Sequence, residues 1–141
     1  MSIEQILYKA HASATGGREG HIFTPSGSLD MKLTTPKELG GAGAAGANPE
    51  EMFAAGYAAC FIGAMKFVCA QKKTTLHADT KVDAVVGIGK IPAGFNVEVD
   101  LKINVPFMAK ADAEALVDAA HEVCPYSNAT RGNVDVRLSV I

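Results

Sequence analysis

Apolar side chains dominate residues 48–70, the longest apolar stretch of the chain, and residues 52–65 carry no charge. A helix with no polar face is typical of a protein interior. Asn48 is suited to cap such a helix, Pro49 suits its first position, and Glu51 can complete a capping box with the cap residue. The pattern therefore predicts a buried helix that begins at Pro49.

A membrane span is the alternative interpretation of this stretch. It is disfavoured because the stretch is rich in Ala and Gly, is interrupted by Lys66, and lacks the roughly 20 apolar residues that a bilayer crossing needs. Small side chains instead allow another backbone to approach closely, and they occupy positions Ala54, Ala55, Gly56, Ala58, Ala59, Gly63 and Ala64. We expect this helix to pack against a partner helix.

Period-two alternation predicts the strands of the fold. It is clearest in residues 95–105, where apolar side chains occupy every odd position up to 105 and polar side chains the even positions between them. Weaker alternation or short apolar runs predict further strands at residues 3–15, 21–23, 29–33, 76–86 and 134–140. The glycines of residues 16–20 predict a hairpin turn, and residues 87–94 predict a long hairpin connection.

A second helix is predicted over residues 111–123, where Leu116, Val117 and Ala120 form an apolar stripe and acidic residues stand near the start. The order is then strands, one buried helix, strands, one amphipathic helix and a final strand. This order is typical of an α+β fold. We expect residues 1–141 to form a single domain, because the length suits one and no linker or repeat interrupts it.

Charge and composition exclude some classes of function. The chain has 13 basic and 15 acidic residues with no basic run, so nucleic acid is not an expected partner. The N-terminus does not resemble a secretory signal, which favours a cytoplasmic location. Thiols are kept reduced there, so the three cysteines are not expected to form a structural framework, and a disulfide between them would be catalytic or redox-sensing.

The three cysteines differ in their expected chemistry. Cys60 lies about three turns into the buried helix, beyond the reach of the helix dipole, so its thiolate needs either a break near Gly56 or a cation from elsewhere. Cys69 is turned to the opposite face and is expected to be inert packing. Cys124, at the end of the second helix, is a poor first nucleophile but a reasonable resolving thiol for an oxidised Cys60.

Spacing alone leaves two interpretations of Cys60 and Cys124 equally open: a peroxidase pair, or two small hydrophobic residues of the core. No CxxC pattern is present, and the histidines are scattered singly, so no zinc site is expected. The Gly/Ala-rich residues 34–47 lack the spacing of a phosphate-binding loop. We expect neither a cofactor nor a metal.

Four separated motifs resemble one known family, in order and in identity. They are TGGREG around Arg18, ANPEEMFAAGY around Glu50, AGYAACF around Cys60 and HEVCPYSNATRGNVDV around Cys124. They resemble the organic hydroperoxide resistance proteins of the OsmC/Ohr superfamily, and the likeness runs from near residue 5 to the end of the chain.

The resemblance implies a thiol peroxidase in which Cys60 attacks an organic hydroperoxide and Cys124 resolves the product as a disulfide. Arg18 would hold the thiolate and polarise the peroxide, and Glu50 would orient Arg18. The resemblance also implies two antiparallel β-sheets around central helices in an intertwined homodimer, with the reactive sites at the subunit interface. A dithiol of the lipoyl type, rather than thioredoxin, would reset the enzyme.

One geometric difficulty accompanies these roles. Ten residues of unbroken helix would place Glu50 about 15 Å from Cys60. A single arginine can then serve both only if the helix breaks, for which Gly56 is the expected place, or if the site is assembled across subunits. Two other functions stay open: an OsmC-type peroxidase with broader peroxide use, and a non-catalytic dimeric binding module.

Overall fold

The computed structural model describes residues 2–141. The chain divides into two compact units, of which the first ends at Pro49 and the second runs Glu50–Ile141. Each unit is built around a sheet of three strands, so the predicted α+β class is confirmed.

The first unit contains an antiparallel sheet in the order β1-β2-β3, formed by β1 (Ser13–Thr15), β2 (His21–Phe23) and β3 (Asp30–Lys32). The predicted strand over residues 3–15 is wrong except for its last three residues. Its possible partner β2 ends at Phe23, which pairs with Ser13, so earlier residues find no backbone neighbour in this sheet. Residues 2–12 are exposed, and they include the apolar Ile3, Ile6, Leu7 and Tyr8.

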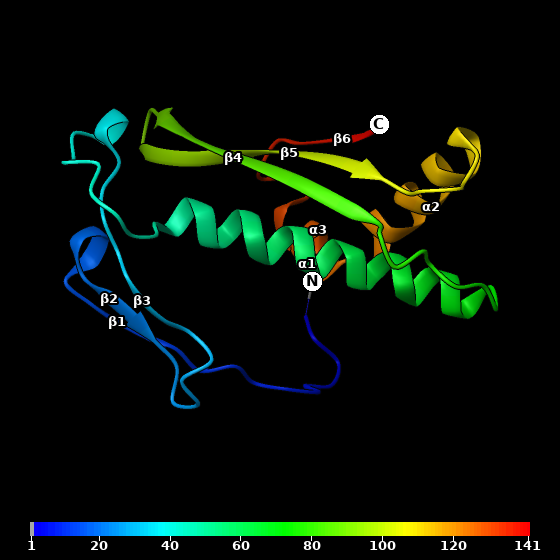
Figure 1. The fold of residues 1–141 in the computed structure, drawn as a ribbon, viewed down its shortest axis with the longest axis horizontal. Coiled ribbons are helices and arrows are strands. Elements are labelled where there is room, and N and C mark those ends of the chain that lie inside the picture. Colours follow the sequence, from blue (N-terminus) through cyan, green and yellow to red (C-terminus); the bar gives the residue numbers. More distant parts are fainter. Residues whose placement is uncertain (1) are drawn as a thin grey trace. The chain divides into compact units, whose positions relative to one another are not determined.

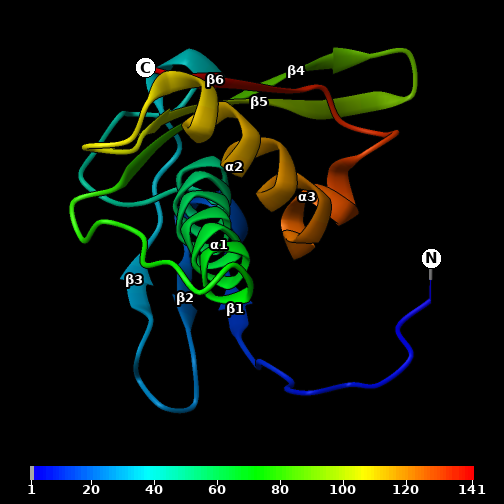
Figure 2. The same ribbon diagram turned by 90° about the vertical axis from the view of Figure 1, so that its right-hand side faces the viewer.

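The second unit carries three helices on one face of the sheet β4-β5-β6 (Figures 1 and 2). The strands are β4 (Lys81–Ile91), β5 (Gly94–Asn104) and β6 (Val136–Val140), and the helices are α1 (Pro49–Gln71), α2 (Lys110–Val123) and α3 (Pro125–Thr130). The start of α1 at Pro49 and the helix expected at 111–123 are confirmed. The short helix α3 was not predicted.

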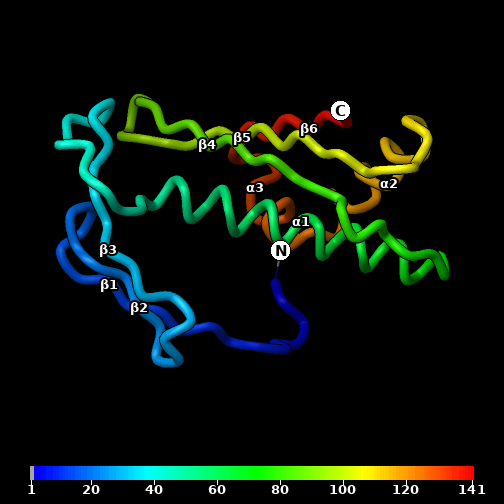
Figure 3. The backbone as a smooth tube through the Cα atoms, in the orientation of Figure 1, coloured from blue at the N-terminus to red at the C-terminus, as the bar shows by residue number. Residues whose placement is uncertain are grey.

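The direction of β6 differs from the expected antiparallel arrangement. β6 runs parallel to β5, with Leu138 opposite Leu101, so this sheet is mixed. Figure 3 shows the chain leaving β5, passing through α2 and α3, and returning along β5 as β6. Parallel neighbours need such a crossover, and the helices between β5 and β6 provide it.

The hairpin between β4 and β5 is also tighter than expected. β4 extends to Ile91 and pairs with β5 up to Gly94, so residues 87–94 are mostly strand rather than a long connection. Gly87 lies within the strand opposite Glu98, whose Cγ would be 3.3 Å from a Cβ added at Gly87. The glycine therefore leaves room for a cross-strand side chain and does not mark a turn.

The core lies between α1, α2 and β5. Tyr57, Phe61 and Met65 of α1 are fully buried together with Val99, Leu101 and Ile103 of β5, as the alternation of β5 predicts. Phe95, however, is 69% exposed, because the start of β5 extends beyond this core. In the described chain, α1 is the one helix long and apolar enough to cross a membrane, but these three side chains place it in a protein core.

One face of α1 is exposed, contrary to the prediction that all its faces are buried. The exposed positions recur every four residues, at Ala55, Ala59, Gly63 and Phe67. Sequence composition does not separate the two faces, because the exposed one is as apolar as the buried one.

Candidate active site

The structure brings together Cys60 and Cys124, two of the candidate residues. Cys60 is half-buried on α1, and Cys124 is fully buried at the junction of α2 and α3. A side-chain hydrogen bond joins the two thiols. Both are free thiols in this structure, and their interaction makes them neighbours, as the two members of a disulfide-forming pair must be.

Backbone hydrogen bonds hold Cys124 between two helices. Its N–H donates to the carbonyl of Ala120, in the last turn of α2, and its carbonyl accepts from the N–H of Asn128, in the first turn of α3. Pro125 occupies the first position of α3, where its missing N–H costs nothing. The Cys-Pro pair was a signal for a second helix start, but we predicted only the end of α2.

The second residue of α3 contacts the candidate nucleophile through its backbone. The N–H of Tyr126 donates a hydrogen bond to the Cys60 sulfur. The tyrosine ring packs edge-on against Phe53 and tilted against Tyr57, both on α1. Tyr126 therefore fixes α3 against α1 beside the cysteine pair, a role that sequence analysis missed.

The environment in this unit disfavours the Cys60 thiolate. Burial raises the pKa of the Cys60 thiol, and the neighbouring Cys124 raises that pKa further, while the hydrogen bond from the Tyr126 N–H acts in the opposite direction. A thiolate is the nucleophilic form of cysteine. Activation of Cys60 therefore requires a positive charge that offsets the effect of burial.

Helix α1 does not break at Gly56, so of the two alternatives that the sequence leaves open, the one with a broken helix is ruled out. The helix is continuous from Pro49 to Gln71. Gly56 serves a different purpose, because a Cβ at this position would lie 2.7 Å from the hydroxyl oxygen of Tyr126. The glycine allows the Tyr126 ring to lie directly against the helix.

An apolar cavity of about 420 Å³ adjoins the cysteine pair. It shares Pro125 and Tyr126 with the segment that holds Cys124, and Phe53 forms part of its wall on α1. The remaining lining residues are Val97, Ala129, Thr130, Asn133 and Val134. Such a cavity suits an alkyl or aryl group, because each buried CH₂ of a ligand contributes about 0.8 kcal/mol.

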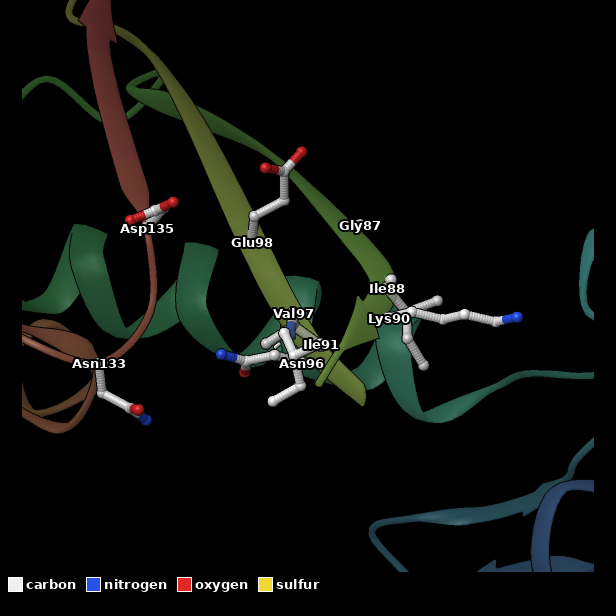
Figure 4. A pocket seen from close by; sticks show the side chains of 10 residues that line it. Gly87, Ile88, Lys90, Ile91, Asn96, Val97, Glu98, Asn133 and Asp135 are labelled. Carbon is white, nitrogen blue, oxygen red and sulfur yellow. Dashed lines mark hydrogen bonds between the residues drawn. The ribbon is translucent and has the colours of Figure 1, made fainter. Parts of the chain in front are cut away.

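A second hollow lies along the β4–β5 hairpin and is separate from the cysteines. Its volume is about 300 Å³, and its lining includes Lys90, Glu98, Asn133 and Asp135 (Figure 4). Neither Cys60 nor Cys124 borders this hollow. Its lining mixes charged residues with Ile88, Ile91 and Val97, so it is less apolar than the cavity beside the cysteines.

The third cysteine is buried in the core, as predicted. Cys69 is 4% exposed and belongs to the same hydrophobic cluster as Leu76 and Val68. Its carbonyl, rather than its sulfur, makes a hydrogen bond with the Thr74 hydroxyl at 3.2 Å. The described chain contains no group of three His, Cys, Asp or Glu residues that could hold a metal ion.

Arg18 and Glu50 belong to different units. Arg18 is half-buried in a 3-10 turn, Gly17–Glu19, within the β1–β2 hairpin. Gly16 and Gly17 have the positive φ that the sequence predicts for this turn, and a Cβ at Gly20 would lie 1.7 Å from the carbonyl oxygen of Thr15. The conformation of the turn that carries Arg18 therefore depends on these glycines.

Glu50 is the second residue of α1 and is half-buried, whereas its neighbour Glu51 is exposed. Because α1 is unbroken, Glu50 and Cys60 are about 15 Å apart along the helix axis. Glu50 is therefore not a direct partner of the Cys60 thiol within one helix.

Comparisons with known proteins agree with the motifs and the fold. The family model described as OsmC-like protein matches residues 40–139. The chain is 61% identical to the organic hydroperoxide resistance protein of Xanthomonas axonopodis pv. citri, over 99% of this chain and 98% of that protein. It is 44% identical to the organic hydroperoxide resistance protein OhrB of Bacillus subtilis, over 95% of this chain and 98% of that protein.

The fold is also similar to that of a solved structure. The organic hydroperoxide resistance protein OsmC of Legionella pneumophila has a TM-score of 0.90 at 47% identity, covering 96% of this chain and 98% of that one. Identity at this level over nearly the full length of both chains shows common family membership. The chain belongs to the OsmC family, among its organic hydroperoxide resistance proteins.

Proposed function

We propose that this protein is a cysteine-based thiol peroxidase that reduces organic hydroperoxides, alkyl or lipid, to alcohols. The contact between the Cys60 and Cys124 thiols carries the proposal. The names of the relatives and the apolar cavity beside the pair support the substrate class. The whole chain acts as one functional domain, since its relatives align over nearly all of it.

Two steps account for the reaction. The Cys60 thiolate attacks the distal oxygen of the hydroperoxide, so that an S–O bond forms, the O–O bond breaks, and the leaving alkoxide takes a proton to become the alcohol. The Cys124 sulfur then attacks the Cys60 sulfur of the sulfenic acid. An S–S bond forms, the S–O bond breaks, and the hydroxide leaves as water with the proton of Cys124.

Arg18 supplies the positive charge that Cys60 requires. A guanidinium beside the sulfur lowers the thiol pKa and stabilises charge that develops on the peroxide oxygens. Glu50 orients this arginine through a charge-assisted hydrogen bond. We propose that Arg18 and Glu50 act across the subunit interface on Cys60 of the partner subunit, because the unbroken α1 removes the alternative in which the helix bends.

A dithiol of the lipoyl type resets the disulfide. Cys124 is fully buried whereas Cys60 is half-exposed, so an external thiol reaches the Cys60 sulfur. A mixed disulfide forms there, and the second thiol of the reductant displaces Cys60. The apolar cavity next to Pro125 supports a small apolar dithiol as the reductant.

Substrate preference tests the proposal. We expect the rate constant for thiol oxidation to be at least about tenfold higher with cumene hydroperoxide than with hydrogen peroxide, because the cavity binds the aryl group. Stopped-flow oxidation with each peroxide measures the two rates. Equal rates would favour an OsmC-type peroxidase of broader use, and no loss of free thiols with either peroxide would favour a binding module.

The protein acts as a homodimer in the cytoplasm. The exposed, small-residue face of α1 and the exposed apolar side chains of residues 3–8 support the dimer. A cysteine pair that must be reset by a dithiol suits a reducing compartment, which supports the cytoplasm.

Replacing Gly63 by Leu tests the dimer. A Cβ at Gly63 meets no atom within 4 Å among the described residues, so the isolated chain accommodates the new side chain. We expect the dimer dissociation constant to rise about 100-fold or more, because leucine separates two closely packed helices. Analytical ultracentrifugation measures this, with Ala115→Leu on the exposed side of α2 as the control. A monomeric wild type, or an unchanged Gly63→Leu dimer, would contradict the proposed interface.

A further inference from the structure

A buried hydrogen-bond chain lies one helical turn from the cysteine pair. The Tyr57 hydroxyl is 2.8 Å from the Ser127 hydroxyl, which is in turn 2.8 Å from Nδ1 of His121. Tyr57 and Ser127 are both fully buried, and His121 is half-buried. None of these three residues has a part in the two chemical steps of the proposed reaction.

The chain joins the same two segments that carry the thiols. Tyr57 precedes Cys60 by three residues on α1, and Ser127 follows Cys124 by three residues on α3. Residues three apart lie on one face of a helix. The Tyr57–Ser127 bond and the Cys60–Cys124 contact are therefore two neighbouring links between α1 and α3.

His121 holds Ser127 from the other side. Burial and the nearby Arg131 lower the pKa of His121, which favours the neutral ring. In the tautomer with Nδ1 unprotonated, the Ser127 hydroxyl donates to His121 and accepts from the Tyr57 hydroxyl. Arg131 completes the arrangement, donating to the His121 carbonyl and to the Asn128 side chain, both at 2.6 Å.

These hydrogen bonds restrict where α3 can pack along α1. A slide of α3 along α1 would break the Tyr57–Ser127 bond. This is unfavourable, because a buried hydroxyl without a partner is desolvated and makes no compensating hydrogen bond. Among the described residues, every buried side-chain nitrogen and oxygen has a partner. A shift of α3 would move Cys124, which precedes this helix as its N-cap residue, away from Cys60.

We propose that Tyr57 and Ser127 are positioning residues for disulfide formation: the hydrogen bond between their hydroxyls sets the register of α3 on α1 and holds Cys124 within reach of Cys60. They act on the second step of the reaction and leave the attack on the peroxide unchanged. Their part in peroxide turnover rests on the proposed function, whereas their effect on the stability of the disulfide does not.

The stability of the Cys60–Cys124 disulfide tests the proposal without peroxide. Equilibration of the full chain with glutathione gives the effective concentration of one thiol toward the other. We expect Tyr57→Phe and Ser127→Ala each to lower it about five- to tenfold, the effect of one buried hydrogen bond. The double variant should lose less than the two single variants combined, because both remove the Tyr57–Ser127 bond; Tyr57→Phe also removes a contact with the Thr130 hydroxyl, and Ser127→Ala also removes the bond with His121.

A matched control separates positioning from general loss of stability. Thr74→Val removes a hydroxyl that donates to the Cys69 carbonyl elsewhere in the same unit, and it should leave the effective concentration unchanged. Tyr57→Phe keeps the buried aromatic ring and removes only the hydroxyl. Its effective concentration therefore tests the proposal even if Ser127→Ala does not fold. Effective concentrations equal to wild type in Tyr57→Phe would overturn the proposal.

A peroxide experiment then tests the step at which the two residues act. With excess cumene hydroperoxide, Tyr57→Phe should react within about twofold of the wild-type rate but accumulate about five- to tenfold more over-oxidised Cys60 relative to disulfide, as mass spectrometry measures. A lowered effective concentration in a chain that does not react with peroxide would refute the proposed function but support the positioning role. Normal peroxide reduction with unchanged over-oxidation and effective concentration would refute the positioning role alone.

Discussion

Cys60→Ser is expected to abolish peroxide reduction, whereas Cys124→Ser should still allow one oxidation of Cys60. A serine hydroxyl does not ionise near neutral pH, so the loss in Cys60→Ser should be about 10⁴-fold or more. In Cys124→Ser the Cys60 sulfenic acid has no neighbouring thiol to attack it. It should therefore stall and then over-oxidise to the sulfinic acid.

Single-turnover measurements distinguish these two variants. The alcohol released per chain reports the first step, and a sulfenic acid trap such as dimedone reports its product. Cys69→Ser is the matched control, because Cys69 is buried away from the pair, and it should behave like wild type. Equal loss of the first burst in Cys60→Ser and Cys124→Ser would contradict the assigned roles.

Removing the charge of Arg18 is expected to have the second largest effect. Arg18→Ala should slow the reaction with organic hydroperoxide about 10²- to 10³-fold, the range for loss of a charged group that stabilises a transition state. Arg18→Lys should fall between this variant and wild type, because lysine keeps the charge but loses the planar fork that engages two partners at once.

The pH dependence of Cys60 alkylation shows whether Arg18 lowers the pKa of the Cys60 thiol. Burial already raises the pKa of Cys60, and removal of a neighbouring cation would raise that pKa further. The alkylation rate of Cys60, measured against pH in a background without Cys69 and Cys124, should therefore shift to higher pH in Arg18→Ala. An unchanged profile together with an unchanged peroxide rate would show that Arg18 is only a turn residue.

Mixed dimers test whether Arg18 acts across subunits. A heterodimer of Cys60→Ser and Arg18→Ala chains retains one complete site if the arginine serves the partner's cysteine, and none if it serves its own. Each heterodimer should have about half of the wild-type activity, and a 1:1 mixture of the two inactive chains should recover about a quarter, because about half of its dimers are heterodimers. An inactive heterodimer, with mixing confirmed by mass spectrometry, would place Arg18 and Cys60 of one chain in the same site.

Elements with a strong local signal were predictable from the sequence. The start of α1 follows from Pro49, and the buried face of β5 follows from its alternation over Val99, Leu101 and Ile103. The hairpin turn before β2 follows from glycines that adopt positive φ. In each case, the residues that determine the element lie within it or next to it.

The errors concern features that depend on distant residues. Gly56 was the expected place for a helix break, should there be one, and Gly87 was assigned to a hairpin connection, yet each makes room for a side chain more than ten positions away, Tyr126 and Glu98 respectively. The helix α3 has six residues, too few to show a periodic apolar stripe. The parallel direction of β6 follows from the path of α2 and α3, which alternation within β6 does not encode.

The candidate site was predictable in part. The resemblance named Cys60 and Cys124, and the structure places their thiols in contact. The apolar cavity and the chain Tyr57–Ser127–His121 were not predicted, because they depend on how α1 packs against α3. Helix packing of this kind is set by the tertiary fold rather than by any single motif.

Peptide mapping of the wild-type protein after one equivalent of cumene hydroperoxide tests the central claim most directly. The account predicts one disulfide per chain between the peptides that contain Cys60 and Cys124, one equivalent of cumyl alcohol, and a free Cys69. A disulfide that includes Cys69, or alcohol production without a Cys60–Cys124 bond, would contradict the account.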